Sequence, residues 1–210
     1  MPKIIKDEYP KADKQDTITV ILVKPRQIPE IIEIPNTLKA KQEIVGGYIQ
    51  AIYPFEDEVS LILNDQGKIN GMPLNRALFI TGDMHTSNMK HGDIYDIIAG
   101  DFLVVGLSED NFKSLDDNLL AKYEKYFHNP ELFVLRDNEI IVLPGQPIND
   151  NKSFKTDYYN GFKYDLRDGD ILIKPRQGDD ISLDVEIKDA RDVSKEIVAE
   201  APTSQIDKDI

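Results

Sequence analysis

Short apolar runs bounded by proline, glycine and polar turns dominate the sequence, and they restrict the chain to a fold made largely of β-strands. The stretch TITVILV, which begins at Thr17, is rich in β-branched residues and runs into Pro25. The stretch IPEIIEIP follows at residues 28–35 and is bounded by prolines. A strand, a turn and a returning strand is the simplest interpretation of this start. The longest apolar runs, such as FLVVG and EIIVLPG, have the length of strands and are far too short to cross a bilayer.

Two stretches carry helical signals instead. Thr37, or the asparagine before it, can cap a short helix at about residues 37–45, which the two following glycines end because glycine readily takes the left-handed conformation. The clearer helix spans about residues 115–127, where apolar residues recur at helical spacing and Ser114 is followed three positions later by Asp117. The sequence therefore predicts an α+β fold with a mixed or antiparallel sheet and these two helices, followed by a C-terminal β-rich extension.

Composition divides the chain into four segments. The two ends are polar or charged with few large apolar residues, which is typical of chain that forms no packed core. Between them, strand-like stretches continue well past the second predicted helix. We expect a flexible N-terminal lead at 1–16, an α+β core domain at 17–131, a β-rich extension or small second domain at 132–188, and an acidic disordered tail at 189–210.

The net charge of −13 bears on the class of partner. Residues 81–134 and residues 179–210 each hold 10 acidic and 4 basic residues, so the excess is concentrated in two segments. Binding to nucleic acids draws on Lys and Arg that neutralise phosphates, so direct nucleic-acid binding is disfavoured, whereas a basic partner remains possible. The start of the chain lacks the apolar core of a signal peptide, so we expect a cytoplasmic protein with no membrane partner.

Catalytic and metal-binding signals are weak. The chain has no cysteine, and we find no Ser-His-Asp order and no glycine-rich phosphate loop. His85 and His91 lie near Asp83 and Asp93 in the stretch GDMHTSNMKHGD, but this histidine spacing is not a recurring metal-ligand motif. A solvated polar loop is the better interpretation. We therefore expect no metal, no cofactor and no catalytic residues, and an enzymatic function is disfavoured.

The four residues Lys-Pro-Arg-Gln occur twice, in VILVKPRQ at residues 20–27 and in DILIKPRQ at residues 170–177. The sequences after the two copies do not align, so the chain is not built from repeats. Proline fixes φ and removes a hydrogen-bond donor, which suits the end of a strand. If the two turns lie side by side, they form a small basic patch for binding. Its residues would be Lys24, Arg26, Lys174 and Arg176.

Asn75 and Arg76, in the stretch GMPLNRAL, are a second candidate binding site. The asparagine can cap a short turn, and the planar guanidinium offers a fork for a carboxylate or a phosphate. The alternative is a purely structural role, as a cap and an intramolecular ion pair. Such groups are more often structural.

A third feature is a set of tyrosines, most of which we expect in the core or half-buried, with an interface patch as the minority interpretation. They are Tyr48, Tyr53, Tyr95, Tyr123, Tyr126, Tyr158, Tyr159 and Tyr164.

Three short motifs occur in order within about residues 18–130: VGGYI, GxPxNR and DIIAGxFLVVG, the second formed by Gly71, Pro73, Asn75 and Arg76. In these motifs and their spacing the chain resembles domain of unknown function 3846. The resemblance implies a small protein of a phage, plasmid or conjugative element, of a kind that sometimes lies beside antirestriction-type domains. It assigns no activity to any residue.

Three functions compete on these grounds. The first is a non-catalytic acidic protein that binds a host protein in the bacterial cytoplasm, of a kind that could counter a host defence system. The second is a DNA mimic of the antirestriction type, in which spaced carboxylates imitate phosphates. The third is a small ligand-binding or enzymatic domain centred on Asn75 and Arg76. The oligomeric state stays open. The carboxylates of the second alternative are Asp93, Asp96, Asp101, Glu109, Asp110, Asp116, Asp117 and Glu124.

Overall fold

The computed structural model describes residues 16–81, 90–109, 111–147, 162–175 and 183–185. Its main sheet has the strand order β2–β1–β7–β4–β3, and the short strand β8 pairs with the last two residues of β7. All of these strand pairs are antiparallel. The strands are β1 (Thr17–Val23), β2 (Glu30–Pro35), β3 (Ile49–Ile52), β4 (Val59–Asn64), β7 (Phe102–Leu107) and β8 (Phe112–Lys113).

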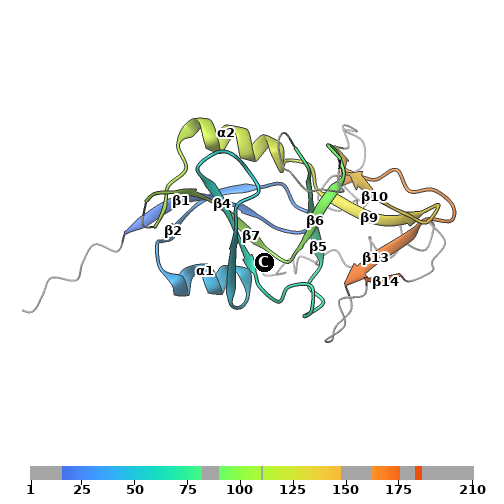
Figure 1. Cartoon of the computed structure of the whole chain (residues 1–210), viewed down its shortest axis with the longest axis horizontal. Helices are drawn as coiled ribbons and strands as arrows, with labels where there is room; N and C mark the ends of the chain where they lie inside the picture. The colour runs from blue at the N-terminus through green and yellow to red at the C-terminus, as the bar shows by residue number, and fades with distance from the viewer. Residues whose placement is uncertain (1–15, 82–89, 110, 148–161, 176–182, 186–210) are drawn as a thin grey trace, which may run out of the picture.

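The main sheet lies between two helices, α1 (Leu38–Val45) and α2 (Asp117–Tyr126), which cover opposite faces (Figure 1). One hydrophobic cluster fills the space under α2 and a second fills the space under α1. Strand β7 is covered on both sides, and its residues from Phe102 to Val105 are each 0% exposed. This is why its sequence is continuously apolar rather than alternating. Neither helix in the described part of the chain is long and apolar enough to span a membrane.

Helix α1 begins and ends as the sequence predicts. The hydroxyl of Thr37 accepts a hydrogen bond from the N–H of Ala40 at 3.2 Å, which satisfies one of the free donors of the first turn. Gly46 follows the last turn with φ 73° and ψ 31°, in the left-handed region that favours glycine. The two helices and the antiparallel sheets confirm the predicted α+β class.

Helix α2 is shorter than predicted, and its cap is a different residue. The carboxylate of Asp116 accepts hydrogen bonds from the N–H groups of Asn118 and Leu119, both at 2.9 Å. Ser114, the predicted cap, instead accepts a hydrogen bond from the N–H of Thr19 in β1. The serine is used to join the chain to the main sheet, so the helix begins two residues later than the capping-box pattern indicated.

Replacing Asp116 by alanine is expected to lower the free energy of unfolding by about 1 kcal/mol, because two main-chain donors lose their acceptor. Asp117→Ala is the matched control. It removes the same charge one residue later, where the carboxylate acts through the helix dipole, and we expect it to cost roughly half as much. Urea unfolding measures both variants, and an equal loss in the two would contradict the assignment of the cap.

The motif DIIAGDFLVVG is divided between two sheets. Strand β6 (Ile94–Ala99) pairs with β5 (Leu74–Phe79) in a separate two-stranded sheet, whereas β7 lies at the centre of the main sheet. The chain passes from one sheet to the other at Gly100, where φ is 79°. A left-handed residue at this point lets two consecutive strands diverge instead of pairing.

The described part of the C-terminal region is also built of strands. Strands β10, β9, β13 and β14 form a four-stranded sheet in that order, and β11 pairs with β12. The hairpin from β9 to β10 turns at Asp137 and Asn138, whose positive φ values of 51° and 66° are those of a tight two-residue turn. These strands are β9 (Glu131–Arg136), β10 (Glu139–Pro144), β11 (Gln146–Pro147), β12 (Phe162–Lys163), β13 (Ile171–Pro175) and β14 (Leu183–Val185).

The C-terminal strands pack on the rest of the chain through β5 and β6 (Figure 1). Phe133 of β9 and Ile173 of β13 share one hydrophobic cluster with Leu74, Ala77 and Ile97. The predicted boundary near residue 131 thus falls between strands that have a common core, and the division into domains stays a prediction. The predicted N-terminal lead, except its last residue, and the predicted acidic tail lie outside the described residues.

Candidate functional site

Arg76 lies at the centre of a buried polar network that joins four parts of the chain. Its side chain is 1% exposed. The guanidinium donates to the carbonyl of Phe127 from Nε and Nη2, both at 3.0 Å, and to the carbonyl of Gln27 from Nη2 at 2.7 Å. Nη1 donates to Oδ1 of Asn75 at 2.9 Å. The planar fork predicted for an external ligand is occupied by the acceptors of the protein itself.

Asn75 continues the network towards the main sheet. Its Nδ2 donates to the carbonyls of Val23 at 3.0 Å and Gly100 at 2.8 Å, and the residue is 0% exposed. Asn75 and Arg76 belong to strand β5, so the predicted turn at this position is wrong. The residues after Pro73 pair with β6 instead of closing a helical turn.

Glu131 is a carboxylate close enough to this network to interact with the charge of Arg76. Its Oε2 accepts a hydrogen bond from the N–H of Ala77 at 2.6 Å. Burial raises the pKa of Glu131 to about 7, although the Ala77 bond and the charge of Arg76 act to lower it. Burial also lowers the pKa of Arg76 to about 10. Both charges are poorly hydrated, so the network favours the structural alternative for Asn75 and Arg76, and a binding role for them stays a prediction.

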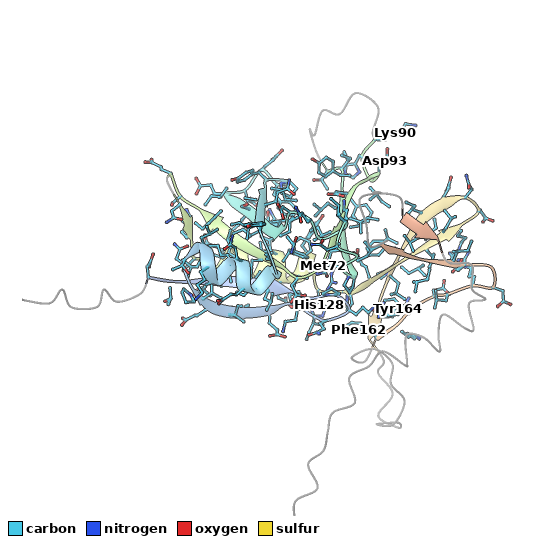
Figure 2. The ribbon with its side chains drawn as sticks, turned by 90° about the horizontal axis from the view of Figure 1, so that it is seen from below. Met72, Lys90, Asp93, His128, Phe162 and Tyr164 are labelled. Carbon is cyan, nitrogen blue, oxygen red and sulfur yellow. The ribbon has the colours of Figure 1, made fainter. Side chains whose placement is uncertain are left out.

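The three sequence motifs meet around Met72, which lies near the middle of the molecule (Figure 2). A methyl group added at Gly100 would approach its sulfur to 2.6 Å, and one added at Gly46 would lie 3.5 Å from its terminal carbon. The N–H of Gly100 also donates to the carbonyl of Pro73 at 2.8 Å. Much of each motif is therefore explained by packing and hydrogen bonding inside the fold.

The two Lys-Pro-Arg-Gln stretches begin at the ends of strands β1 and β13, which belong to different sheets. The first forms the turn between β1 and β2, where Lys24 is paired with Glu30 at 3.4 Å and Arg26 has φ 60°. The second ends β13, where the main chain of Lys174 lies opposite Asp184 of β14. Arg176 lies outside the described residues. The predicted basic patch stays untested.

The carboxylates of the DNA-mimic alternative are dispersed over several elements. Asp101 precedes β7 and Glu109 follows it, so the six residues of the strand, about 20 Å at 3.3 Å per residue, separate the two. Asp93 also lies well apart from His128, the residue with which the carboxylate of Glu124 is paired (Figure 2). Asp96 is paired with Lys68, Glu124 with His128, and Asp116 caps α2, whereas Asp117 is exposed and Asp110 lies outside the described residues.

Asp101 is a poor mimic of a phosphate, because burial raises the pKa of its carboxyl group and so disfavours its charged form. A mimic of DNA needs charges that are exposed and evenly spaced along one surface. The placement of these residues thus supports this alternative less than the sequence alone did.

For the metal alternative, His91 is exposed, and His85 and Asp83 lie outside the described residues. In the described ranges no group of three or more metal-ligand side chains is gathered.

An exposed surface next to α1 and β3 was not predicted. Its most exposed large apolar side chain is Tyr48, at 72%, which directly follows the two glycines that end α1. It borders a surface depression of about 310 Å³, and Leu38 at the start of α1 is 58% exposed. Lys39 and Glu43 form an exposed ion pair at 3.7 Å along the same helix. We call this the α1–β3 surface, formed by Leu38, Lys39, Gln42, Glu43, Gly47 and Tyr48.

The expectation that most tyrosines are buried or half-buried is wrong for Tyr48 and Tyr53, which lie at the surface. Tyr123 is 1% exposed, Tyr164 is half-buried, and Tyr95 and Tyr126 are each less than half exposed. Periodicity could not identify them, because Tyr48 and Tyr53 stand just outside the two ends of β3, where strand alternation no longer applies. The exposed tyrosines are Tyr48 (72%), Tyr53 (62%), Tyr95 (46%) and Tyr126 (42%).

Comparison with known protein families gives a match over more than half of the chain. Residues 18–128 match domain of unknown function 3846 (DUF3846), which covers the main sheet, both helices and the β5–β6 pair. The C-terminal strands from β9 onwards lie outside the matched region. No curated protein and no solved structure matches the chain.

Proposed function

Because the chain belongs to the DUF3846 family, we propose that it is a non-catalytic protein of a phage or another mobile element that binds a protein of its bacterial host, such as a component of a defence system. The proposal draws its mobile-element context from the family resemblance. It draws the contact surface from the position of Tyr48, and the character of the partner from the net charge of −13.

The observation that carries the proposal is the exposure of Tyr48 within the motif VGGYI. Gly46 caps α1, and a methyl group at Gly47 would come within 2.6 Å of the Asn64 side chain, so both glycines are needed by the fold. The tyrosine after them is 72% exposed and borders the depression on the α1–β3 surface. Tyrosine is enriched at the centre of protein interfaces because it offers a large rigid contact area and a polar end.

The charge of the protein supports a basic partner. An excess of carboxylates accelerates the association of an oppositely charged protein and repels nucleic acids. Several of the described carboxylates are internally paired, and those considered above as phosphate mimics lie on several elements, so within the described residues they form no single array. A diffuse field suits long-range attraction followed by a local contact at the α1–β3 surface.

Tyr48→Ala is expected to abolish capture of the partner while the protein stays folded. Loss of a central interface tyrosine weakens binding by about 10-fold or more. Because the side chain is mostly exposed, the free energy of unfolding should change by less than about 0.5 kcal/mol. The measurement is affinity capture from a lysate of the bacterial host with mass spectrometry, together with urea unfolding of the same preparations.

Tyr95→Ala is the matched control, since Tyr95 is also exposed but lies on β6. We expect it to capture the same host protein as the unaltered chain. Recovery of no specific protein by the unaltered chain would count against the proposal. Equal capture by both variants would place the contact away from the α1–β3 surface.

A further inference from the structure

The two edges of the main sheet differ in how they are protected against pairing with another strand. Strand β2 directly follows Pro29 and ends at Pro35, and its Glu30 and Glu33 are exposed. Proline removes a ladder donor, and charged side chains make strand addition costly, so these are common devices for blocking an edge. Strand β2 is therefore a closed edge.

Strand β3, at the opposite edge, has the sequence Ile-Gln-Ala-Ile and carries neither a proline nor a charge. Among the described strands, only β4 pairs with it. Tyr48 and Tyr53 stand directly before and after it, 72% and 62% exposed. An unprotected edge between two exposed aromatic residues is the arrangement expected of a strand that receives another strand.

The hydrogen-bond pattern shows which main-chain groups of β3 face outwards. The N–H of Asp65 donates to the carbonyl of Tyr48 at 3.0 Å, so this is a hydrogen-bonded pair of the β3–β4 ladder. Bonded and non-bonded pairs alternate along antiparallel strands. The register of β3 with β4 therefore directs the N–H and C=O groups of Ile49 and Ala51 away from β4.

Acidic residues lie at both ends of β3. Asp65 is exposed next to Tyr48, and Glu56 is exposed in the loop that leads from β3 to β4. In that loop Asp57 is paired with Lys122, and Glu58 with Lys113. A segment laid along β3 would thus meet a carboxylate near each of its ends. A second copy of this chain is a poor occupant, because it would bring the same acidic ends and a net charge of −13 into contact with their like.

We propose that β3 is a docking edge for an extended segment of the partner protein, apolar or β-branched in its centre and flanked by Lys or Arg, which adds a strand next to β3. This inference rests on the proposed function and specifies the kind of partner. Main-chain bonds to Ile49 and Ala51 supply the pairing, the two tyrosines contact the ends of the segment, and Asp65 and Glu56 favour its basic flanks.

The test uses the full chain and a short fluorescent peptide of alternating valine and threonine with lysine at both ends, compared with the same peptide ended by glutamate. The lysine-ended peptide is expected to bind at least 10-fold more tightly, with an affinity that falls as salt is added. Ala51→Pro removes an outward N–H without touching the β4 ladder, and we expect it to weaken this binding at least 10-fold. Equal binding of the two peptides, or unchanged binding by Ala51→Pro, would overturn the inference.

A second pair of variants does not depend on the proline substitution folding. Gln50 is exposed in the middle of β3, so Gln50→Lys should weaken binding of the lysine-ended peptide and Gln50→Glu should strengthen it. No difference between them would contradict a basic-flanked strand at this edge. A dimer of the unaltered chain in sedimentation that Ala51→Pro dissolves would show that a second copy is the occupant. These measurements need no host protein, so they are independent of the capture experiment. The peptide can fail to bind β3 while Tyr48 is still needed for capture of a host protein, and the peptide can bind while capture fails.

Discussion

Replacing Arg76 by methionine is expected to lower the free energy of unfolding by about 3–5 kcal/mol, because a buried charge network would lose its central member. The carbonyls of Phe127 and Gln27 would lose their guanidinium donors. Each buried polar group left without a partner costs about 1–3 kcal/mol. Glu131 would also lose the positive charge that favours its ionised form. Urea unfolding followed by circular dichroism measures the change.

Two control variants distinguish the effect of breaking this network from the effect of losing any arginine. Arg76→Lys keeps the charge but has no planar fork, so it should recover only part of the stability. Arg167→Met makes the same substitution at an exposed arginine whose ion pair with Asp165 spans 3.7 Å, and it should cost less than about 1 kcal/mol. If Arg76→Met unfolded at the same urea concentration as the unaltered chain, the network would not be the structural centre described above.

The second large effect is a dependence of stability on pH that Glu131→Gln should remove. Because the pKa of Glu131 is raised from 4.5 to about 7 in the folded protein, the unfolded chain loses this proton first as the pH rises. Ionisation of Glu131 therefore disfavours the folded state progressively between about pH 4.5 and pH 7. Below that window the group is protonated in both states and has no such effect.

Relative to Glu131→Gln, the unaltered chain should thus lose on the order of 2–3 kcal/mol of stability between pH 4.5 and pH 8. The glutamine oxygen can still accept the hydrogen bond from Ala77, so the geometry of β5 is kept. The measurement is the difference in free energy of unfolding between the two proteins across this pH range. A constant difference would mean that Glu131 ionises alike in the folded and unfolded chains. Glu139→Gln, at an exposed position of β10, is the control and should change the free energy of unfolding by less than about 0.5 kcal/mol.

Local signals in the sequence were sufficient for the elements whose structure depends on near neighbours. The β1–β2 hairpin follows from a β-branched run and a proline turn, and the β9–β10 hairpin from a two-residue turn between apolar strands. Helix α1 follows from the Thr37 cap and Gly46. In each case the decisive contacts join residues a few positions apart, so the pattern of the sequence contains them.

Long-range pairing decided what these signals could not. Ser114 has the sequence context of a helix cap, but its hydroxyl accepts a hydrogen bond from the N–H of Thr19, 95 positions away. Asp116 caps the helix instead. Asn75 and Arg76 have the side chains of a binding site, but their acceptors lie 25 to 52 positions away for most of their bonds. Polar side chains look alike in sequence whether they face solvent or a carbonyl from a distant segment.

The candidate docking edge shows the same division most clearly. The stretch YIQAIYPF, which follows Gly46 and Gly47, has the composition of a strand, because β-branched and aromatic content and the glycines that end a helix are local properties. Pairing with distant strands shortens the strand to Ile49–Ile52 and places it at the edge of its sheet, with Tyr48 and Tyr53 exposed just beyond its two ends. The position of a strand in a sheet depends on which distant strands pair, and those pairings are fixed by the packing of the whole core rather than by the strand itself.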